Sequence, residues 1–148
     1  MKERDDATQR GDAFEEMRTT GLLAEICRVH GEPAEHHAQR ALELAKQLGD
    51  RPNIVLNTLR VATVLFYEGH HPQAERQFRA LITEMHQQGE SDRLDTAYQH
   101  LGKCLAEQGR HDAALGCFEQ ALERRTDPAL RASTLAAIGE AMRLRSQS

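Results

Sequence analysis

The side chains best suited to chemistry in this sequence belong to its eight histidines, which can bind metal ions or transfer protons near neutral pH. His36-His37, His70-His71 and His111 recur at comparable points of the chain, and His30 lies close to the first pair. Adjacent residues of a turn or a helix point in different directions, and the zinc-binding pattern HExxH does not occur. We therefore expect these histidines to be solvated turn residues, and a metal site is the alternative interpretation.

The cysteines do not form a metal-binding or redox motif. Cys27, Cys104 and Cys117 are an odd set without CxxC spacing, and each lies among apolar neighbours. We interpret them as small buried hydrophobic residues, with a redox or metal role as the alternative. The sequence also lacks a nucleophile elbow and a phosphate-binding glycine loop. We predict a protein without catalytic residues, cofactor or metal.

The composition favours helices and excludes several classes of protein. Ala, Leu, Glu, Gln and Arg are abundant, whereas Trp is absent and aromatic residues make up 4% of the chain. A formal net charge of −4 provides no basic field for nucleic acid. No apolar run is long enough to cross a membrane, and the charged start MKERDD differs from a signal peptide. We predict a soluble, cytoplasmic protein that binds neither nucleic acid nor membranes.

Turn and capping residues divide the chain into seven expected helices. Gly69 and Gly109 each follow apolar residues at helical spacing, and glycine readily adopts the left-handed conformation that ends a helix. Pro72 and the pair Asp127-Pro128 suit the first turn of a helix. The expected helices cover residues 12–30, 33–48, 53–68, 71–88, 91–108, 111–125 and 128–145.

Apolar, small and glycine positions recur about 40 residues apart, which indicates a repeat array. Leu65, Gly69, Ala74, Phe78 and Ile82 correspond to Leu105, Gly109, Ala114, Phe118 and Leu122. The third unit resembles the tetratricopeptide repeat family through Tyr98, Leu101-Gly102, Leu105, Gly109, Ala114, Phe118, Ala121 and Pro128. The first two units match more loosely. The period of about 40 in place of about 34 is similar to that of repeats in bacterial peptide-sensing regulators and signalling ATPases.

The resemblance implies an all-α fold, a right-handed α-α superhelix of about three helical hairpins with a C-terminal capping helix. The hairpins would cover residues 12–50, 51–90 and 91–127 of a single domain, 12–148, and the capping helix residues 128–145. Charges on one face of the last helix, such as Arg131 and Glu140, suit it to end the array. Asp12 and Glu15 form a capping-box pattern, so residues 1–11 are expected to be disordered or frayed.

In this family the first helices of the hairpins line a concave groove, where proteins or peptides bind. The resemblance places in that groove Arg28, Leu56, Leu59, Arg60, Thr63, Phe66, Tyr67, Gln99, His100, Lys103, Glu107 and Arg143. The apolar members would bury side chains of a partner, and Arg28, Arg60 and Lys103 would fix its register by charge. Some members bind a partner's C-terminal carboxylate with Lys, Asn and Arg, but Gln99 and His100 stand where basic residues are expected.

Helix 53–68 is apolar on nearly all sides, which a helix packed on one side does not require. Either it is core, or it exposes a patch that awaits a partner. We predict a non-enzymatic adaptor, sensor or chaperone-like protein that binds a protein or peptide in its groove. The alternative is a self-associating structural unit, in which helix 53–68 or the terminal helix makes a homodimer. An enzyme or metal protein built on the histidines ranks below both.

Overall fold

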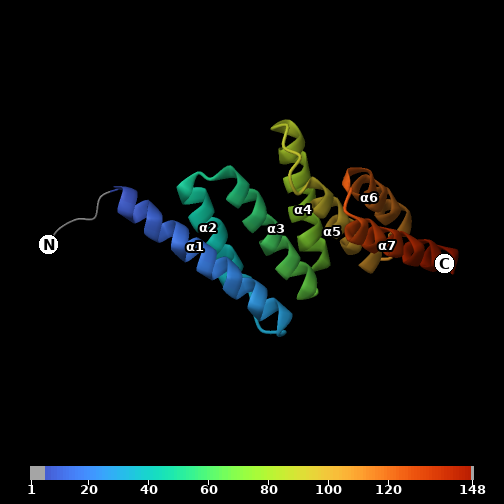
Figure 1. The fold of residues 1–148 in the computed structure, drawn as a ribbon. Coiled ribbons are helices and arrows are strands. Elements are labelled where there is room, and N and C mark those ends of the chain that lie inside the picture. Colours follow the sequence, from blue (N-terminus) through green and yellow to red (C-terminus); the bar gives the residue numbers. More distant parts are fainter. Residues whose placement is uncertain (1–5, 148) are drawn as a thin grey trace. The chain divides into compact units, whose positions relative to one another are not determined.

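Residues 6–147, which the computed structural model describes, form an all-α fold without strands (Figure 1). The helices of this part of the chain are α1 (Asp6–Val29), α2 (Glu35–Leu48), α3 (Arg51–Tyr67), α4 (His71–Gln87), α5 (Leu94–Glu107), α6 (His111–Arg124) and α7 (Pro128–Ser146). Each corresponds to one predicted helix, so the predicted all-α class is confirmed.

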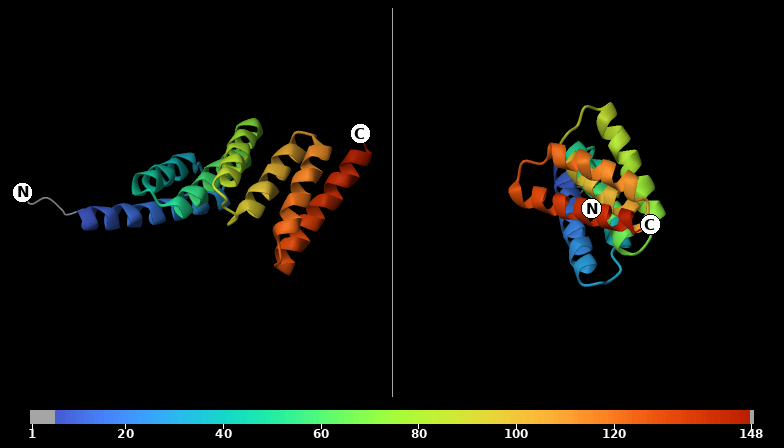
Figure 2. Two further views of the ribbon diagram at one scale, coloured as in Figure 1. Left: turned by 90° about the horizontal axis from the view of Figure 1, so that it is seen from above. Right: turned by 90° about the vertical axis from the view of Figure 1, so that its right-hand side faces the viewer.

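Contacts within the chain divide it into two compact units, Met1–Glu68 and Gly69–Ser148. In the first unit α2 packs against α1 and α3, and α1 also contacts α3. In the second unit α4 packs against α5, and α5, α6 and α7 form a row of neighbouring helices (Figure 2). The boundary at Gly69 falls in the turn of the predicted hairpin 51–90. The single domain 12–148 therefore stays a prediction.

Two aspartates fix the starts of the helices that follow them. The Asp50 carboxylate accepts a hydrogen bond from the Asn53 backbone N–H (3.3 Å). The Asp127 carboxylate accepts from the backbone N–H groups of Ala129 (2.9 Å) and Leu130 (3.1 Å). Such caps pair N–H groups that have no partner inside the helix. The predicted start at Asp127 is thus confirmed.

The predicted start of the first helix is wrong, because α1 begins at Asp6 and residues 6–11 are helical. The Nη2 of Arg10 donates a hydrogen bond to the backbone carbonyl of Leu48 at the end of α2 (3.0 Å). Carbonyls at a helix end have no partner within their own helix, so this contact holds the extension of α1 against α2. Residues 1–5 of the predicted frayed segment lie outside the described residues.

The predicted start of the fifth helix is also wrong, since α5 begins at Leu94 instead of residue 91. Residues 91–93 form a turn in which the Leu94 N–H donates to the carbonyl of Ser91 (3.1 Å). Arg93 has φ 68°, a left-handed backbone conformation that residues other than glycine rarely adopt. The sequence offers no glycine there to mark this turn.

Small residues let the helices of each unit approach closely. In the first unit Met17 of α1 is buried in a cluster with Ala41, Leu44, Ala45 and Leu48 of α2. In the second unit Ala114 and Ala121 of α6 are fully buried, as their positions in the repeat pattern predict. A methyl group added to Gly102 of α5 would lie 2.5 Å from Cε1 of Phe118. That position therefore requires glycine.

Burial keeps the thiols of α5 and α6 protonated. Cys104 is fully buried, and burial raises the pKa of its thiol to about 12. Burial also raises the pKa of the half-buried Cys117. A protonated thiol is a poor nucleophile and a poor metal ligand. The interpretation of the cysteines as small buried hydrophobic residues is confirmed for Cys104, and Cys27 is half-buried.

Glu75 of α4 connects its own helix to the end of α5 and the turn that follows it. Its carboxylate accepts hydrogen bonds from Arg79 (2.8 Å), from Nε2 of Gln108 (3.0 Å) and from Arg110 (2.8 Å). Burial acts to raise the pKa of Glu75, but the hydrogen bonds from Arg79 and Gln108 and the charges of Arg110 and Arg79 outweigh it and lower the pKa. The charged form of Glu75 therefore stabilises the second unit.

Replacing Glu75 by glutamine should lower the free energy of unfolding at pH 7 by about 1–2 kcal/mol, because hydrogen bonds to a charged group are lost. The folded-state pKa lies below the ordinary value of 4.5, so the contribution is complete above that value. It disappears as the pH falls through the lower folded-state pKa. Urea unfolding of both proteins across this pH range measures the difference. A difference that grows toward low pH would contradict this role of Glu75.

Candidate functional site

A groove with a volume of about 240 Å³ lies between α1 and α3 of the first unit. It is lined by Phe14, Met17, Arg18 and Leu22 of α1 and by Asn53, Leu56, Asn57 and Arg60 of α3. Phe14 and Leu22 are exposed and Leu56 is half-buried, so apolar surface is accessible beside two guanidinium groups. We call these eight residues the α1–α3 groove. Two of the predicted groove residues, Leu56 and Arg60, belong to it.

Arg60 lies against α1 because residue 21 has no side chain. A methyl group on Gly21 would come 2.5 Å from Nη1 of Arg60. That Nη1 donates a hydrogen bond to Oδ1 of Asn57 (3.0 Å), and Nε of Arg60 lies 3.4 Å from the carboxylate of Glu25. Asn57 is itself buried and donates from Nδ2 to the carbonyl of Asn53 (2.8 Å). The contact with Asn57, one helix turn earlier on α3, thus holds the Arg60 guanidinium group in the groove.

Replacing Gly21 by alanine should displace the Arg60 head group without unfolding the protein. The clash falls on the end of a flexible side chain, and alanine favours a helix by about 1 kcal/mol over glycine. The free energy of unfolding should therefore stay constant or rise slightly, while the NMR signal of the Arg60 Nε–H group shifts. A loss of stability above about 1 kcal/mol would contradict this, because overpacking a rigid neighbour costs that much or more.

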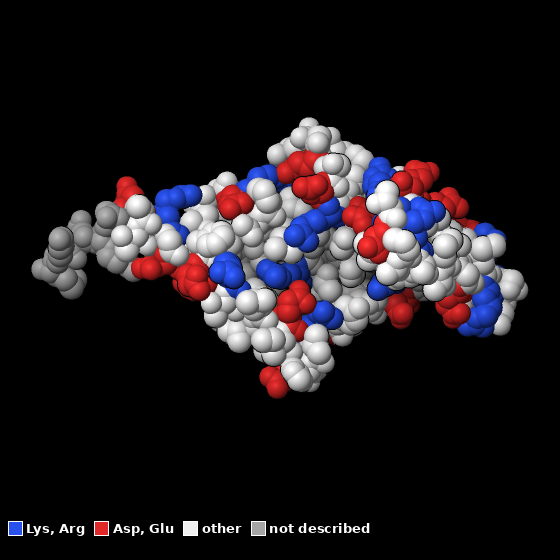
Figure 3. All heavy atoms as spheres, in the orientation of Figure 1, with Lys and Arg blue, Asp and Glu red and all other residues white. Residues whose placement is uncertain are grey.

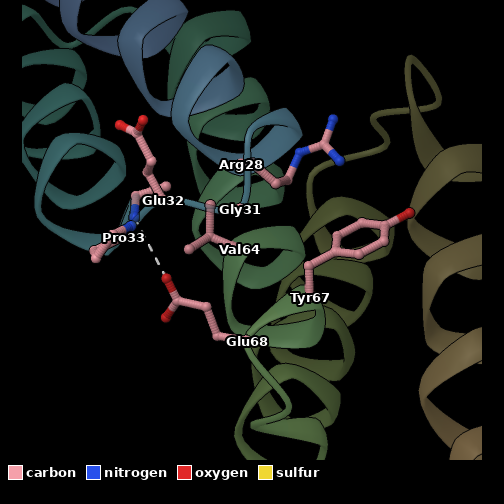
Figure 4. A pocket seen from close by; sticks show the side chains of 8 residues that line it. Arg28, Gly31, Glu32, Pro33, Val64, Tyr67 and Glu68 are labelled. Atoms are coloured by element: carbon pink, nitrogen blue, oxygen red, sulfur yellow. Dashed lines mark hydrogen bonds between the residues drawn. The ribbon is translucent and has the colours of Figure 1, made fainter.

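A second cavity of about 330 Å³ lies where α1 ends, and it contains two more predicted residues (Figure 4). The guanidinium of Arg28 stands 4.9 Å from the centre of the Tyr67 ring and donates to the carboxylate of Glu25 (3.0 Å). On the other side of the cavity, the Glu68 carboxylate accepts from the Ala34 backbone N–H (3.4 Å). Glu32 and Glu68 both line this cavity, so it has carboxylates that the α1–α3 groove lacks in its lining.

The remaining predicted residues of α3 belong to the lining of neither the α1–α3 groove nor the second cavity. Leu59 is buried, and Thr63 and Phe66 are half-buried. The Phe66 ring packs edge-on against Tyr67, with 5.1 Å between the ring centres. Most apolar residues of α3 are core, namely Val55, Leu59, Val61, Ala62, Val64 and Leu65. Of the two interpretations of helix 53–68, the structure supports core for these residues and places Leu59 away from the surface.

In the second unit, Gln99 is buried and does not line a surface. Its Oε1 accepts a hydrogen bond from the Thr134 hydroxyl of α7 (3.0 Å). His100 is half-buried, and its ring stacks on Phe78 of α4 at 5.7 Å between centres. The predicted groove position of Gln99 is therefore wrong. This residue connects the first helix of the last hairpin to the helix that covers it.

Three predicted residues of the second unit remain accessible. Lys103 is half-buried, and Glu107 and Arg143 are exposed. The guanidinium of Arg143 is paired with Glu140 one turn earlier on α7 (2.6 Å). Such an exposed pair contributes little to stability. These side chains are consequently available for contacts with another molecule.

Most of the large hydrophobic side chains that are exposed lie on the terminal helices, and α3 contributes Tyr67. On α1 they are Phe14, Leu22, Leu23, Ile26 and Val29, and on α7 they are Leu130, Leu135 and Met142. The prediction that α7 presents charges is therefore incomplete, since Leu135 and Met142 are each about half exposed beside them. Apolar residues at helical spacing predict that a helix has an apolar face. They do not tell whether another helix covers that face.

The histidines begin second helices of the expected hairpins. His70 precedes the first residue of α4, His71 opens α4, and His111 opens α6. For these three histidines the predicted position at turns is confirmed to within one residue, whereas His36 and His37 lie in the first turn of α2. Within residues 6–147, no three His, Cys, Asp or Glu side chains gather in a geometry that could hold a metal ion.

Charge and hydropathy complete the description of the surface. Basic and acidic side chains are interspersed on the face of residues 6–147 shown in Figure 3. Across the described helices, none combines the length and apolar character needed to span a membrane.

The model of the tetratricopeptide repeat family matches residues 54–127, half of the chain. The chain belongs to the tetratricopeptide repeat family. The match runs from α3 to α6 and includes Gly102, Ala114, Phe118 and Ala121, whose close packing the structure shows. A search of curated proteins gave no match. Membership of the tetratricopeptide repeat family suggests a protein-interaction module.

Most residues of the α1–α3 groove were not predicted from the sequence. Phe14 and Leu22 were not among the predicted residues, although the first repeat was expected to contribute Arg28. Gly21 could have been noticed, because an isolated glycine inside a helical pattern often marks a close approach. Asn57 lies one turn before Arg60, so its contact with Arg60 is accessible from helical spacing alone.

Proposed function

We propose that this protein is a non-enzymatic adaptor, sensor or chaperone-like module of the cytoplasm, which binds a protein or peptide in the α1–α3 groove. The observation that carries the proposal is accessible apolar surface beside Arg18 and Arg60. Helices α1 and α3 are first helices of successive repeats, the elements on which this family binds its partners. Accessible predicted residues of the second unit, Lys103, Glu107 and Arg143, are proposed as further contacts.

Site-specific photo-crosslinking in a lysate of the native organism tests this proposal. A photoreactive residue at Leu22, in the groove and exposed, should capture a protein that the same residue at Gln39 of α2 does not capture. Replacing Arg60 by glutamate should abolish capture at Leu22 while the circular dichroism spectrum stays helical. Equal capture from both positions, or capture that survives Arg60→Glu, would refute the proposal.

Self-association is the second candidate, and the exposed side chains Leu135 and Met142 of α7 favour it. A second copy could cover this face, because exposed apolar patches often mark interfaces. Light scattering over a dilution series would reveal a dimer that Leu135→Glu dissociates. A monomer at micromolar concentration would exclude this candidate.

A further inference from the structure

We infer that the occupant of the α1–α3 groove is a segment of a partner protein that presents an acidic side chain between two apolar ones, each about 6 Å from the next. The inference rests on the proposed function and specifies the class of partner. It follows from the order of side chains along α1 and α3 and from the charges that surround them.

The spacing comes from α1. Phe14, Arg18 and Leu22 are four residues apart, and four residues of helix rise about 6 Å. They therefore present an apolar, a cationic and an apolar group in one row. On α3, Leu56 and Arg60 repeat the same four-residue step from apolar to cationic. A complementary segment places its carboxylate opposite the arginines and its apolar groups on either side.

The charged side chains of the lining favour an acidic occupant over a basic or a purely apolar one. The groove lining contains two arginines and two asparagines but no carboxylate. Arg18 lies 3.8 Å from the carboxylate of Glu15, Arg60 shares Glu25 with Arg28, and the Asp50 carboxylate accepts a hydrogen bond from Nδ2 of Asn53 (3.0 Å). These carboxylates lie outside the lining of the groove, whereas Arg18 and Arg60 belong to it. An apolar partner would strip water from Arg18 and Arg60 without replacing it, which is costly.

The arginines differ in how freely they can bind an added carboxylate. The side chains of Arg18 and Glu15 are 58% and 72% exposed, so their ion pair is weak and Arg18 can turn toward a partner. Arg60 is held by Asn57, and its buried Nε lies 3.4 Å from the Glu25 carboxylate but makes no hydrogen bond among the described residues. A carboxylate can accept two hydrogen bonds from one guanidinium group, which adds geometric specificity.

Two conformations of the partner satisfy the spacing, and the test distinguishes them. A helix presents neighbouring side chains on one face at four-residue steps. An extended strand presents every second side chain on one face, about 6.6 Å apart. Helix-in-groove and extended binding are both established ways of recognising a peptide. The apolar–acidic–apolar order is common to both.

The test is an NMR titration of the full-length, 15N-labelled protein with synthetic peptides of about 15 residues. One peptide carries Leu, Glu and Leu at four-residue steps in an alanine-rich helix, and one carries them at two-residue steps in an extended sequence. In matched peptides lysine replaces the glutamate. The better glutamate peptide should shift amide signals of residues 14–22 and 53–60 and bind at least about fivefold more tightly than its lysine counterpart.

Charge reversal on the protein should reverse this preference. Arg18→Glu changes an exposed residue, so the fold should survive, and the lysine peptide should then bind more tightly than the glutamate peptide. Lys46→Glu makes the same change in net charge on an exposed residue of α2 outside the groove, and it should leave the preference intact. Arg60→Gln is a second variant, which removes a positive charge without adding a negative one. It should also weaken the preference for the glutamate peptide.

Several results would overturn the inference. Equal binding of glutamate and lysine peptides would do so, and so would shifts confined to other surfaces. Groove signals that shift with protein concentration alone would show that a second copy is the occupant. If Leu22 still captures a partner in these cases, the proposed function stands and only the acidic partner class is wrong. If no peptide shifts the groove signals and Leu22 captures nothing, both fail.

Discussion

Replacing Asp95 by alanine should lower the free energy of unfolding by about 3–5 kcal/mol, because it leaves a buried guanidinium group without its counter-charge. The side chain of Arg125 is 5% exposed, and its Nε lies 2.8 Å from the Asp95 carboxylate of α5. Nη1 of Arg125 donates to the hydroxyl of Thr134 on α7 (2.9 Å), which in turn donates to Gln99. These polar contacts connect α5 to α7 through the residue that follows α6.

Urea unfolding followed by circular dichroism measures this loss, and two variants serve as controls. The double variant Asp95→Ala, Arg125→Met should be more stable than Asp95→Ala alone, since removing both charges avoids an unpaired one. Asp112→Ala breaks the exposed pair with Arg145 and should cost less than about 1 kcal/mol. A cost for Asp95→Ala as small as that of Asp112→Ala would show that Arg125 finds other partners or water.

This polar cluster also shows where sequence reasoning fails. Glycine, proline and aspartate predict where α3, α4, α6 and α7 begin or end, because those residues act through the local backbone. Gln99 and Thr134 are 35 residues apart, and Arg125 and Asp95 are 30 apart. The repeat pattern predicts that Gln99 lies on the first helix of a hairpin. It does not predict that α7 covers this face of the helix. Burial of polar side chains depends on such distant partners.

The sequence predicts the α3 side of the α1–α3 groove better than the α1 side. Leu56 and Arg60 lie in the region that the family model matches, and both line the groove. Phe14 and Leu22 come from α1, outside that region, and α1 begins six residues earlier than the capping pattern predicted. The repeat period of about 40 residues is longer than the usual period of about 34, and the helices of the second hairpin show part of this extra length. Helices α3 and α4 each have 17 residues, whereas α5 and α6 each have 14.

Replacing Phe118 by alanine should cost about 3–5 kcal/mol of unfolding free energy, the range for truncating a fully buried phenylalanine. Phe118 of α6 is buried, and its ring lies against the bare Cα of Gly102 on α5. The positions of both residues in the repeat pattern predict this contact between the two helices of one hairpin. Thermal and urea unfolding would measure the loss, and Phe14→Ala, at an exposed position, should cost far less.

A double-mutant cycle isolates the contact between Gly102 and Phe118. In the parent protein, Gly102→Ala places a methyl group 2.5 Å from Cε1 and 2.7 Å from Cδ1 of the ring, and such overpacking costs about 1–3 kcal/mol. In the Phe118→Ala background the same methyl group enters vacated space, and alanine's helix propensity should make the change favourable by about 1 kcal/mol. If Gly102→Ala has the same effect in both backgrounds, the ring does not set the requirement for glycine. A change of sign between backgrounds would assign that requirement to the close approach of α5 and α6, the feature that makes this pair of helices a repeat.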